Sequence, residues 1–282
     1  MTQRIHIPET GWTGVRVGDL QLAVFDEGTG PVVLLQHGYP DTPHTWDDVA
    51  AHLVERGFRV IRPFGRGIAP SDIPAGDAFH IRDQAADVVG ILDALDIETA
   101  SLVGHDWGAT AVWGAGHLAP ERIHKLVAVA IPHPAAIRMT PRLLWGSRHF
   151  IANRLPGAAR RYARNDYAHV RHMYERWSPG FDWPDAEFEA VKNAYAAPGC
   201  FHAALGYYRR LDRWPFRGPV ACDTLVIGGL TDGVLKPAHF EASTRRVSGS
   251  CTVRMLPGGH FLHREHPEPF IETLTAFLQD ST

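Results

Sequence analysis

Ser101-Leu-Val-Gly-His-Asp-Trp-Gly-Ala109 is the stretch that decides the fold, because an apolar run leads into a glycine-flanked turn and a helical pattern follows. The arrangement Gly104-x-Asp106-x-Gly108 matches the nucleophile elbow, a sharp turn from a strand into a helix. Glycines permit a close approach that a Cβ would obstruct. The turn holds Asp106 at the sheet edge, near a helix N-terminus that favours an anion. Asp106 is therefore a candidate nucleophile; an inactive elbow or a helix-capping Asp is the alternative.

Besides residues 100–104, which lead into this turn, five short apolar runs along the chain are bounded by turn residues. Each has the pattern expected of a strand that is buried on both faces. Helical patterns separate several of these runs. Strands that alternate with helices predict an α/β protein with a mostly parallel central sheet flanked by helices. The expected strands are residues 31–36, 58–63, 100–104, 125–130, 224–229 and 252–256, and the expected helices include 46–56, 82–95 and 269–278.

The alternation stops after Ala130 and resumes at Thr224. The interval is basic: residues 135–217 hold 14 Lys and Arg against seven Asp and Glu, and six of the chain's seven tyrosines lie between Tyr162 and Tyr208. We interpret this interval as a helical lid. The expected organisation is a core domain of residues 1–134 and 218–282, with a lid of residues 135–217 inserted in it.

The overall composition is that of an ordinary globular protein. The chain has 282 residues, 45% hydrophobic and 21% charged, with a net charge of −3, which argues against disorder, collagen and coiled coil. No apolar run approaches the ~20 residues of a membrane span, and the first ten residues lack the apolar region of a signal peptide. Cys200, Cys222 and Cys251 resemble reduced thiols, so we expect a cytoplasmic protein, monomeric or homodimeric. An acidic chain with no basic run longer than two residues argues against nucleic-acid binding.

Further motifs accompany the elbow along nearly the whole chain. Together they resemble the α/β-hydrolase superfamily, and within it the epoxide hydrolase and haloalkane dehalogenase branch. Nucleophile, acid and base appear in the order of that family. The motifs are His37-Gly-Tyr-Pro40, Arg62-Pro-Phe-Gly-Arg-Gly67 with Ser71, the Gly-His-Asp-Trp-Gly elbow, Gly228-Gly-Leu-Thr-Asp232, and Gly258-Gly-His260 with His266-Pro-Glu268.

An aspartate suits attack on a saturated carbon. A serine would form an ether there, whereas a carboxylate forms an ester, which water can cleave. With a reference pKa of about 3.9, Asp106 is ionised near neutrality and needs no base to activate it. The resemblance makes His260 the general base for the second step, with Asp232 orienting its ring. It also implies that the backbone N–H groups of Tyr39 and Trp107 form the oxyanion hole.

A metal site is a competing interpretation of His260, His263 and His266, which form an H-x2-H-x2-H run. Spacings of three on a loop that leads into a helix do not match common ligand spacing. We therefore expect no metal and no organic cofactor, and structural roles for His263 and His266.

Lid side chains separate the possible substrates, because an epoxide leaves as an alkoxide that needs a proton, whereas a halide needs only hydrogen-bond donors. Epoxide hydrolases supply two lid tyrosines. The segment Ala204-Leu-Gly-Tyr-Tyr-Arg209 resembles the second tyrosine motif and makes Tyr208 the proton donor. The first tyrosine, counted from Pro156-Gly157, falls on His149 instead. This histidine could donate a proton as imidazolium, donate to a halide, or be a buried structural residue.

These patterns predict a hydrolase that acts on a small molecule through an ester on Asp106, most simply an epoxide hydrolase that forms vicinal diols. A haloalkane or haloacid dehalogenase with the same triad, another hydrolase that uses this ester, and a non-catalytic ligand-binding protein are the alternatives. The candidate residues of the substrate and leaving-group pocket are His37, His149, Phe150 and Tyr207.

Overall fold

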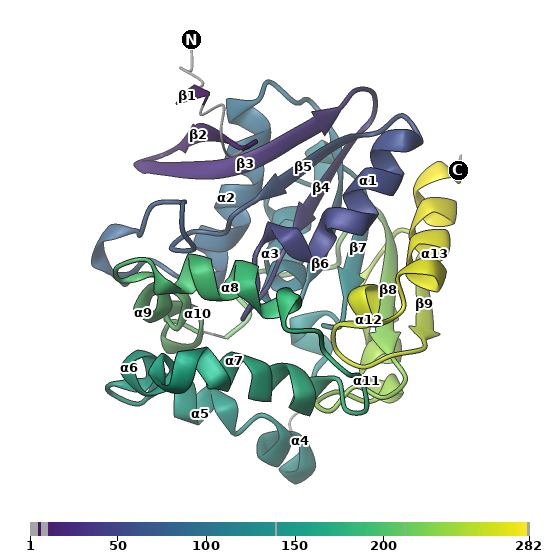
Figure 1. Cartoon of the computed structure of the whole chain (residues 1–282). Helices are drawn as coiled ribbons and strands as arrows, with labels where there is room; N and C mark the ends of the chain where they lie inside the picture. Colours follow the sequence, from purple (N-terminus) through teal and green to yellow (C-terminus); the bar gives the residue numbers. More distant parts are fainter. Residues whose placement is uncertain (1–4, 7–10, 139, 212, 281–282) are drawn as a thin grey trace.

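The structure is a computed structural model, and it describes residues 5–6, 11–138, 140–211 and 213–280. Most of the N-terminal stretch on which the signal-peptide expectation rests lies outside these ranges. Nine strands form one sheet in the order β1-β2-β3-β5-β4-β6-β7-β8-β9 (Figure 1). The strands are β1 Ile5–His6, β2 Thr13–Val17, β3 Leu20–Gly28, β4 Val32–Gln36, β5 Arg59–Pro63, β6 Ala100–His105, β7 Ile123–Val129, β8 Asp223–Gly229 and β9 Cys251–Leu256.

The sheet is parallel from β5 to β9, and β1, β2 and β3 add an antiparallel edge. This confirms the predicted α/β class and its mostly parallel sheet. All six predicted strands are present, each within two residues of the expected ends. The three strands at the antiparallel edge were not predicted, because β2 and β3 combine buried and half-buried positions and give no continuous apolar run.

Helices cover both faces of the sheet. On one face, Val88 and Ile91 of α2 pack with Val112 of α3 in one apolar cluster. On the other face, Leu53 of α1 packs with Leu274 of α13 in a second cluster. The core helices are α1 Asp47–Glu55, α2 Ile81–Ala94, α3 Trp107–Leu118, α11 Pro237–Glu241, α12 Leu262–Glu265 and α13 Pro267–Gln279. No helix among the described residues is long and apolar enough to cross a membrane.

The interval between β7 and β8 is helical, and Figure 1 shows its helices gathered at the end of the sheet toward which β8 and β9 point. Their interior forms a third apolar cluster that also includes Tyr39, Trp107 and Phe261 of the core. The boundaries 135–217 remain our proposal for the lid. Its helices are α4 Pro141–Gly146, α5 His149–Arg154, α6 Ala158–Tyr162, α7 Arg164–Trp177, α8 Ala186–Ala196, α9 Cys200–Ala204 and α10 Gly206–Arg209.

A tight turn joins β6 to α3 at Asp106, whose φ of 53° lies in the left-handed region. A side chain that is not glycine holds this conformation only where its surroundings enforce it. The packing around the turn leaves no space: a Cβ on Gly104 would come within 2.3 Å of the Gly108 carbonyl oxygen, and one on Gly108 within 2.2 Å of the Gln36 carbonyl oxygen. The two glycines therefore allow the backbone to close around Asp106, as the sequence predicts.

The crowding at Gly104 predicts that a single methyl group destabilises the protein. Gly104→Ala forces backbone atoms apart, so we expect the free energy of unfolding to fall by roughly 1–3 kcal/mol or more. Gly146→Ala is the matched control, because its Cβ would meet only the Val234 carbonyl oxygen, at 3.8 Å. Urea unfolding of the two variants measures the difference, and equal stability would contradict the role of Gly104 in closing the turn.

Candidate active site

Three loops at the sheet edge bring the predicted triad together. Asp106 lies between β6 and α3, Asp232 follows β8, and His260 follows β9. The Nδ1 atom of His260 lies 2.9 Å from Asp232 Oδ2, and its Nε2 atom lies 3.3 Å from Asp106 Oδ2. All three side chains are buried. The imidazole ring therefore lies between two carboxylates.

Asp232 is fixed by its own loop. Its Oδ1 atom accepts hydrogen bonds from the backbone N–H groups of Val234, at 2.6 Å, and Leu235, at 2.9 Å. This leaves Oδ2 directed at His260. Because Nδ1 of His260 then donates to Asp232, the Nε2 atom is the one that faces Asp106.

The two carboxylates control the charge of the site. Burial alone would lower the pKa of His260, but the negative charge of Asp232 and the hydrogen bonds with Asp106 and Asp232 outweigh it and raise the pKa to about 10. Burial alone would raise the pKa of Asp106, but the hydrogen bond and positive charge of His260 lower it. At neutral pH the resting pair is thus a carboxylate and an imidazolium.

The second oxygen of Asp106 has a backbone partner. The N–H group of Tyr39 donates to Asp106 Oδ1 over 2.8 Å, which places this predicted oxyanion-hole donor on the nucleophile. Trp107 is the first residue of α3 and follows Asp106 directly. The role of its backbone N–H group stays a prediction.

Aromatic side chains from the lid and the core lie around Asp106, and we call this group of rings the aromatic wall. The ring of Tyr208 lies 5.2 Å from Trp107, 5.1 Å from Phe150 and 5.1 Å from Tyr39, measured between centroids. Burial and the negative charge of Asp106 raise the pKa of Tyr208 well above its usual value of 10. Its phenol is therefore protonated at neutral pH and lies in the field of the carboxylate.

His149 joins the same wall from α5. Its ring lies 5.8 Å from Tyr208 and 5.0 Å from Trp177, and among the described residues its Nδ1 atom has no hydrogen-bond partner. Burial lowers the pKa of His149 to about 3, even though the charge of Asp106 acts in the opposite direction. The ring is neutral at physiological pH, which argues against the interpretation of His149 as an imidazolium donor. Donation by a neutral ring and a structural role stay open.

Two of the predicted pocket residues use their polar atoms elsewhere. The Nδ1 atom of His37 lies 2.9 Å from the Gly38 carbonyl oxygen, and its Nε2 atom accepts the N–H of Gly65 over 2.9 Å. The hydroxyl of Tyr207 donates to the Arg66 carbonyl oxygen over 2.8 Å. His37 and Tyr207 therefore brace backbone turns and line a cavity of about 20 Å³, large enough for one water molecule. Their expected place in the leaving-group pocket stays a prediction.

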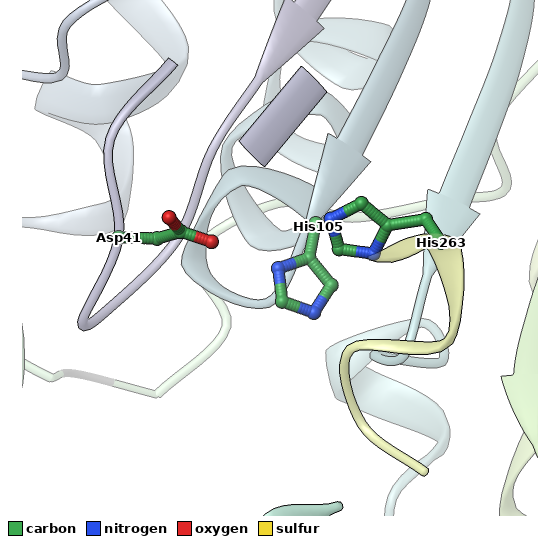
Figure 2. Close-up of side chains that lie close together, drawn as sticks. All are labelled: Asp41, His105 and His263. Carbon is green, nitrogen blue, oxygen red and sulfur yellow. The ribbon is translucent and has the colours of Figure 1, made fainter. Parts of the chain in front are cut away.

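A polar cluster that sequence reasoning did not assemble lies behind the triad. It consists of Asp41, His105 and His263, whose potential ligand atoms lie within 4.8 Å of one another, and Figure 2 shows a ring nitrogen of His105 turned toward Asp41. The other ring nitrogen of His105, Nε2, lies 2.9 Å from the His260 carbonyl oxygen. Asp41 directly follows the His37-Gly-Tyr-Pro40 motif, which is the signal that could have identified it.

Hydrogen bonds account for much of this cluster. The Thr45 hydroxyl lies 2.8 Å from His263 Nε2, and a hydrogen bond from Thr45 opposes the rise that burial causes in the pKa of Asp41. Thr45 thus links two of the three side chains, whereas Asp41 Oδ2, His105 Nδ1 and His263 Nδ1 have no hydrogen-bond partner among the described residues. The expectation that no metal binds stays a prediction, and His263 belongs to this network.

Comparisons with known proteins agree with this architecture. A family model described as the α/β hydrolase fold matches residues 31–267. An epoxide hydrolase of Caballeronia sordidicola is 27% identical over 318 residues, which cover 94% of this chain and 92% of that protein. Epoxide hydrolase A of Mycobacterium tuberculosis is 28% identical over 307 residues, 94% of each chain. The crystal structure of Bacillus megaterium epoxide hydrolase with an inhibitor superposes with a TM-score of 0.86 at 21% identity, over 95% of this chain and 100% of that one, which is a likeness of fold.

The buried neutral histidines predict that acid destabilises the protein. Burial lowers the pKa of His37 to about 4 and the pKa values of His105 and His149 to about 3, whereas an unfolded histidine titrates near 6.5. Between these values the unfolded state binds more protons, so the free energy of unfolding falls as the pH drops below about 6.5. Each such histidine contributes about 1.4 kcal/mol per pH unit.

Replacement of one of these rings tests the argument. We expect His149→Phe to reduce the dependence of unfolding free energy on pH by about one proton between pH 6 and 4.5, measured by urea unfolding. Replacement of the exposed His124 by Gln is the control, and its slope should match the unmodified protein. An unchanged slope in His149→Phe would show that His149 is not held neutral by burial.

Proposed function

The chain belongs to the α/β hydrolase fold family and is a hydrolase, and from this premise we propose that it opens epoxides to vicinal diols through an ester on Asp106. Two relatives named epoxide hydrolase align over nearly the whole chain. The observation that carries the proposal is that the protonated Tyr208 lies in the field of the ionised Asp106 and packs against Trp107, the residue after it. A nucleophile and a proton donor for the leaving oxygen are the two groups that epoxide opening needs.

In the first step a carboxylate oxygen of Asp106 attacks one ring carbon. The carbon–oxygen bond of the epoxide breaks, and the released alkoxide takes the phenolic proton of Tyr208. The products are an ester on Asp106 and a phenolate. Asp106 needs no base here, because the hydrogen bond and charge of His260 already favour its ionised form.

Formation of the ester changes the charge of the base. The pKa of His260 is raised to about 10 by two carboxylates, and esterification removes the charge of one of them. The pKa of His260 then falls, and its proton passes to the phenolate of Tyr208. His260 becomes a neutral base at the moment when water has to be activated.

In the second step His260 takes a proton from water, and the hydroxide attacks the ester carbonyl carbon. The oxyanion forms beside the N–H of Tyr39, with the N–H of Trp107 as the second proposed donor. The bond between the carbonyl carbon and the ester oxygen breaks, and that oxygen, which stays on the substrate carbon, takes the proton of the new carboxyl group. Asp106 is ionised and His260 is protonated again, as at the start.

Every bond change in this cycle is assigned to a side chain, a backbone N–H or water. We therefore propose a small-molecule substrate and no metal or organic cofactor. A cytoplasmic location, the absence of nucleic-acid binding and a monomeric or homodimeric state remain predictions from composition.

A dehalogenase with the same nucleophile is the second candidate. Two ring nitrogens, Trp177 Nε1 and His149 Nδ1, lack hydrogen-bond partners among the described residues, and their rings lie 5.0 Å apart. The Trp177 indole is an N–H donor, and such donors suit a halide leaving group, which needs no proton. Epoxide opening needs a proton for the leaving oxygen and halide release does not, so loss of the Tyr208 hydroxyl should affect mainly the first reaction.

The ester predicts a mass change on Asp106. His260→Gln should form the ester and hydrolyse it very slowly, so that the peptide containing Asp106 carries the mass of one substrate molecule. Asp106→Asn, measured before its amide has time to hydrolyse, is the control and should carry no added mass. Panels of epoxides and haloalkanes are compared by mass spectrometry of the digested protein. If neither panel labels Asp106 in His260→Gln, the ester mechanism is wrong.

The leaving group predicts a selective effect at Tyr208. Tyr208→Phe should slow epoxide opening about 10²–10⁴-fold, as expected for loss of a general acid. Release of bromide from a haloalkane should change by less than about 10-fold, since bromide takes no proton. The control is Tyr207→Phe, which removes a hydroxyl that donates to a backbone carbonyl and should alter both reactions equally. Equal effects of Tyr208→Phe on both substrates would contradict its role as acid.

A further inference from the structure

The last turn of α7 packs directly on the loops that carry two triad residues. We use the name strap for its residues 176–178. The carbonyl oxygen of Trp177 accepts the N–H of His260 over 3.0 Å and the N–H of Gly233, the neighbour of Asp232, over 3.1 Å. One carbonyl of the lid is thus the shared acceptor for the loop of the acid and the loop of the base.

Two side chains extend this contact to both neighbours of His260. The Ser178 hydroxyl donates to Glu265 Oε1 over 2.5 Å and accepts the N–H of Phe261 over 3.1 Å. Both carboxylate oxygens of Glu265 accept the N–H of Gly259, at 3.0 and 2.9 Å. The residues before and after the base are therefore each held by a member of this pair.

The strap is closely packed against the loops that carry Asp232 and His260, with no room for an added methyl group at the two contact points. A Cβ on Gly233 would come within 2.3 Å of the Arg176 carbonyl oxygen, and one on Gly259 within 2.5 Å of the Ser178 Cα. Ser178 is fully buried, and Glu265 is 8% exposed. If the Ser178–Glu265 hydrogen bond broke, the buried Ser178 hydroxyl would have no acceptor. The free-energy penalty of such an unpaired polar group keeps the two side chains together.

We propose that Ser178 and Glu265 are positioning residues for His260, and that they fix the angle at which the base meets the water that attacks the ester. The inference rests on the proposed function, in which His260 takes a proton only in the second step. The nucleophile is held by the turn between β6 and α3, which the strap does not form. Loss of the pair should therefore slow hydrolysis of the ester and leave formation of the ester nearly unchanged.

Separate measurement of the two steps tests the proposal. In Ser178→Ala and Glu265→Ala, rapid quenching and mass spectrometry of the Asp106 peptide should give ester formation within about 2-fold of the unmodified protein. Ester decay should be about 10–100-fold slower, the usual cost of a misplaced catalytic group. Glu265→Gln keeps one acceptor and should recover part of the decay rate. Ser243→Ala is the matched control, because this buried serine accepts the N–H of His133 and does not contact the triad.

The outcomes distinguish the inference from the proposed function. Equal slowing of both steps, or decay at the unmodified rate in both alanine variants, would overturn the positioning role. Failure of His260→Gln to form any ester would instead reject the ester mechanism. In that case proton NMR still decides the positioning role: the Nδ1–H signal of His260 should shift or broaden in Ser178→Ala and stay unchanged in Ser243→Ala. An unaltered signal in Ser178→Ala would overturn the inference.

Discussion

The hydrogen-bonded row from Asp106 through His260 to Asp232 is the interaction on which the rest of the site depends. One imidazole serves two buried carboxylates, and each of its nitrogens has a fixed partner. Burial strengthens the attraction between opposite charges in this row and penalises any charge that is left alone. Removal of one charge therefore changes the protonation of the others, and the elements around the row act mainly to keep the three groups in line.

Each of these groups is held by backbone geometry at the end of a different strand. The turn at Asp106 needs two glycines, the loop of Asp232 binds its own carboxylate, and His260 follows Gly259, against which Ser178 packs. Parallel strands place their carboxyl ends at the same edge, so residues 106, 232 and 260 meet although they are far apart in the chain.

The sequence predicts the parts of the molecule that depend on local pattern. Strands β4 to β8 lie inside the parallel sheet, and burial on both faces gives them apolar runs that are readily recognised. The sequence does not predict the antiparallel edge, because β2 and β3 are only partly buried and have no continuous apolar run. The triad was predictable because glycine-rich motifs mark each of its turns.

Side chains whose partners are distant in sequence were not predictable. The Nε2 atom of His37 and the hydroxyl of Tyr207 bind distant backbone atoms, which only the folded structure reveals. Glu265 is 87 residues from Ser178, and its sequence context, a polar stretch before a helix, resembles an ordinary exposed turn. The neutrality of His149 also depends on burial that the sequence does not encode locally.

The position of α7 limits how a new specificity can arise in this chain. Helices α5 and α10 contribute Phe150, His149 and the proposed proton donor Tyr208 to the aromatic wall. Helix α7 ends in a carbonyl that two triad loops share. A lid transplanted whole from a relative would carry a different α7 and shift the loops of Asp232 and His260, whereas exchange of α4–α6 keeps the shared carbonyl in place. The lid is thus divided into helices that line the proposed pocket and a short end of α7 that holds the loops of Asp232 and His260.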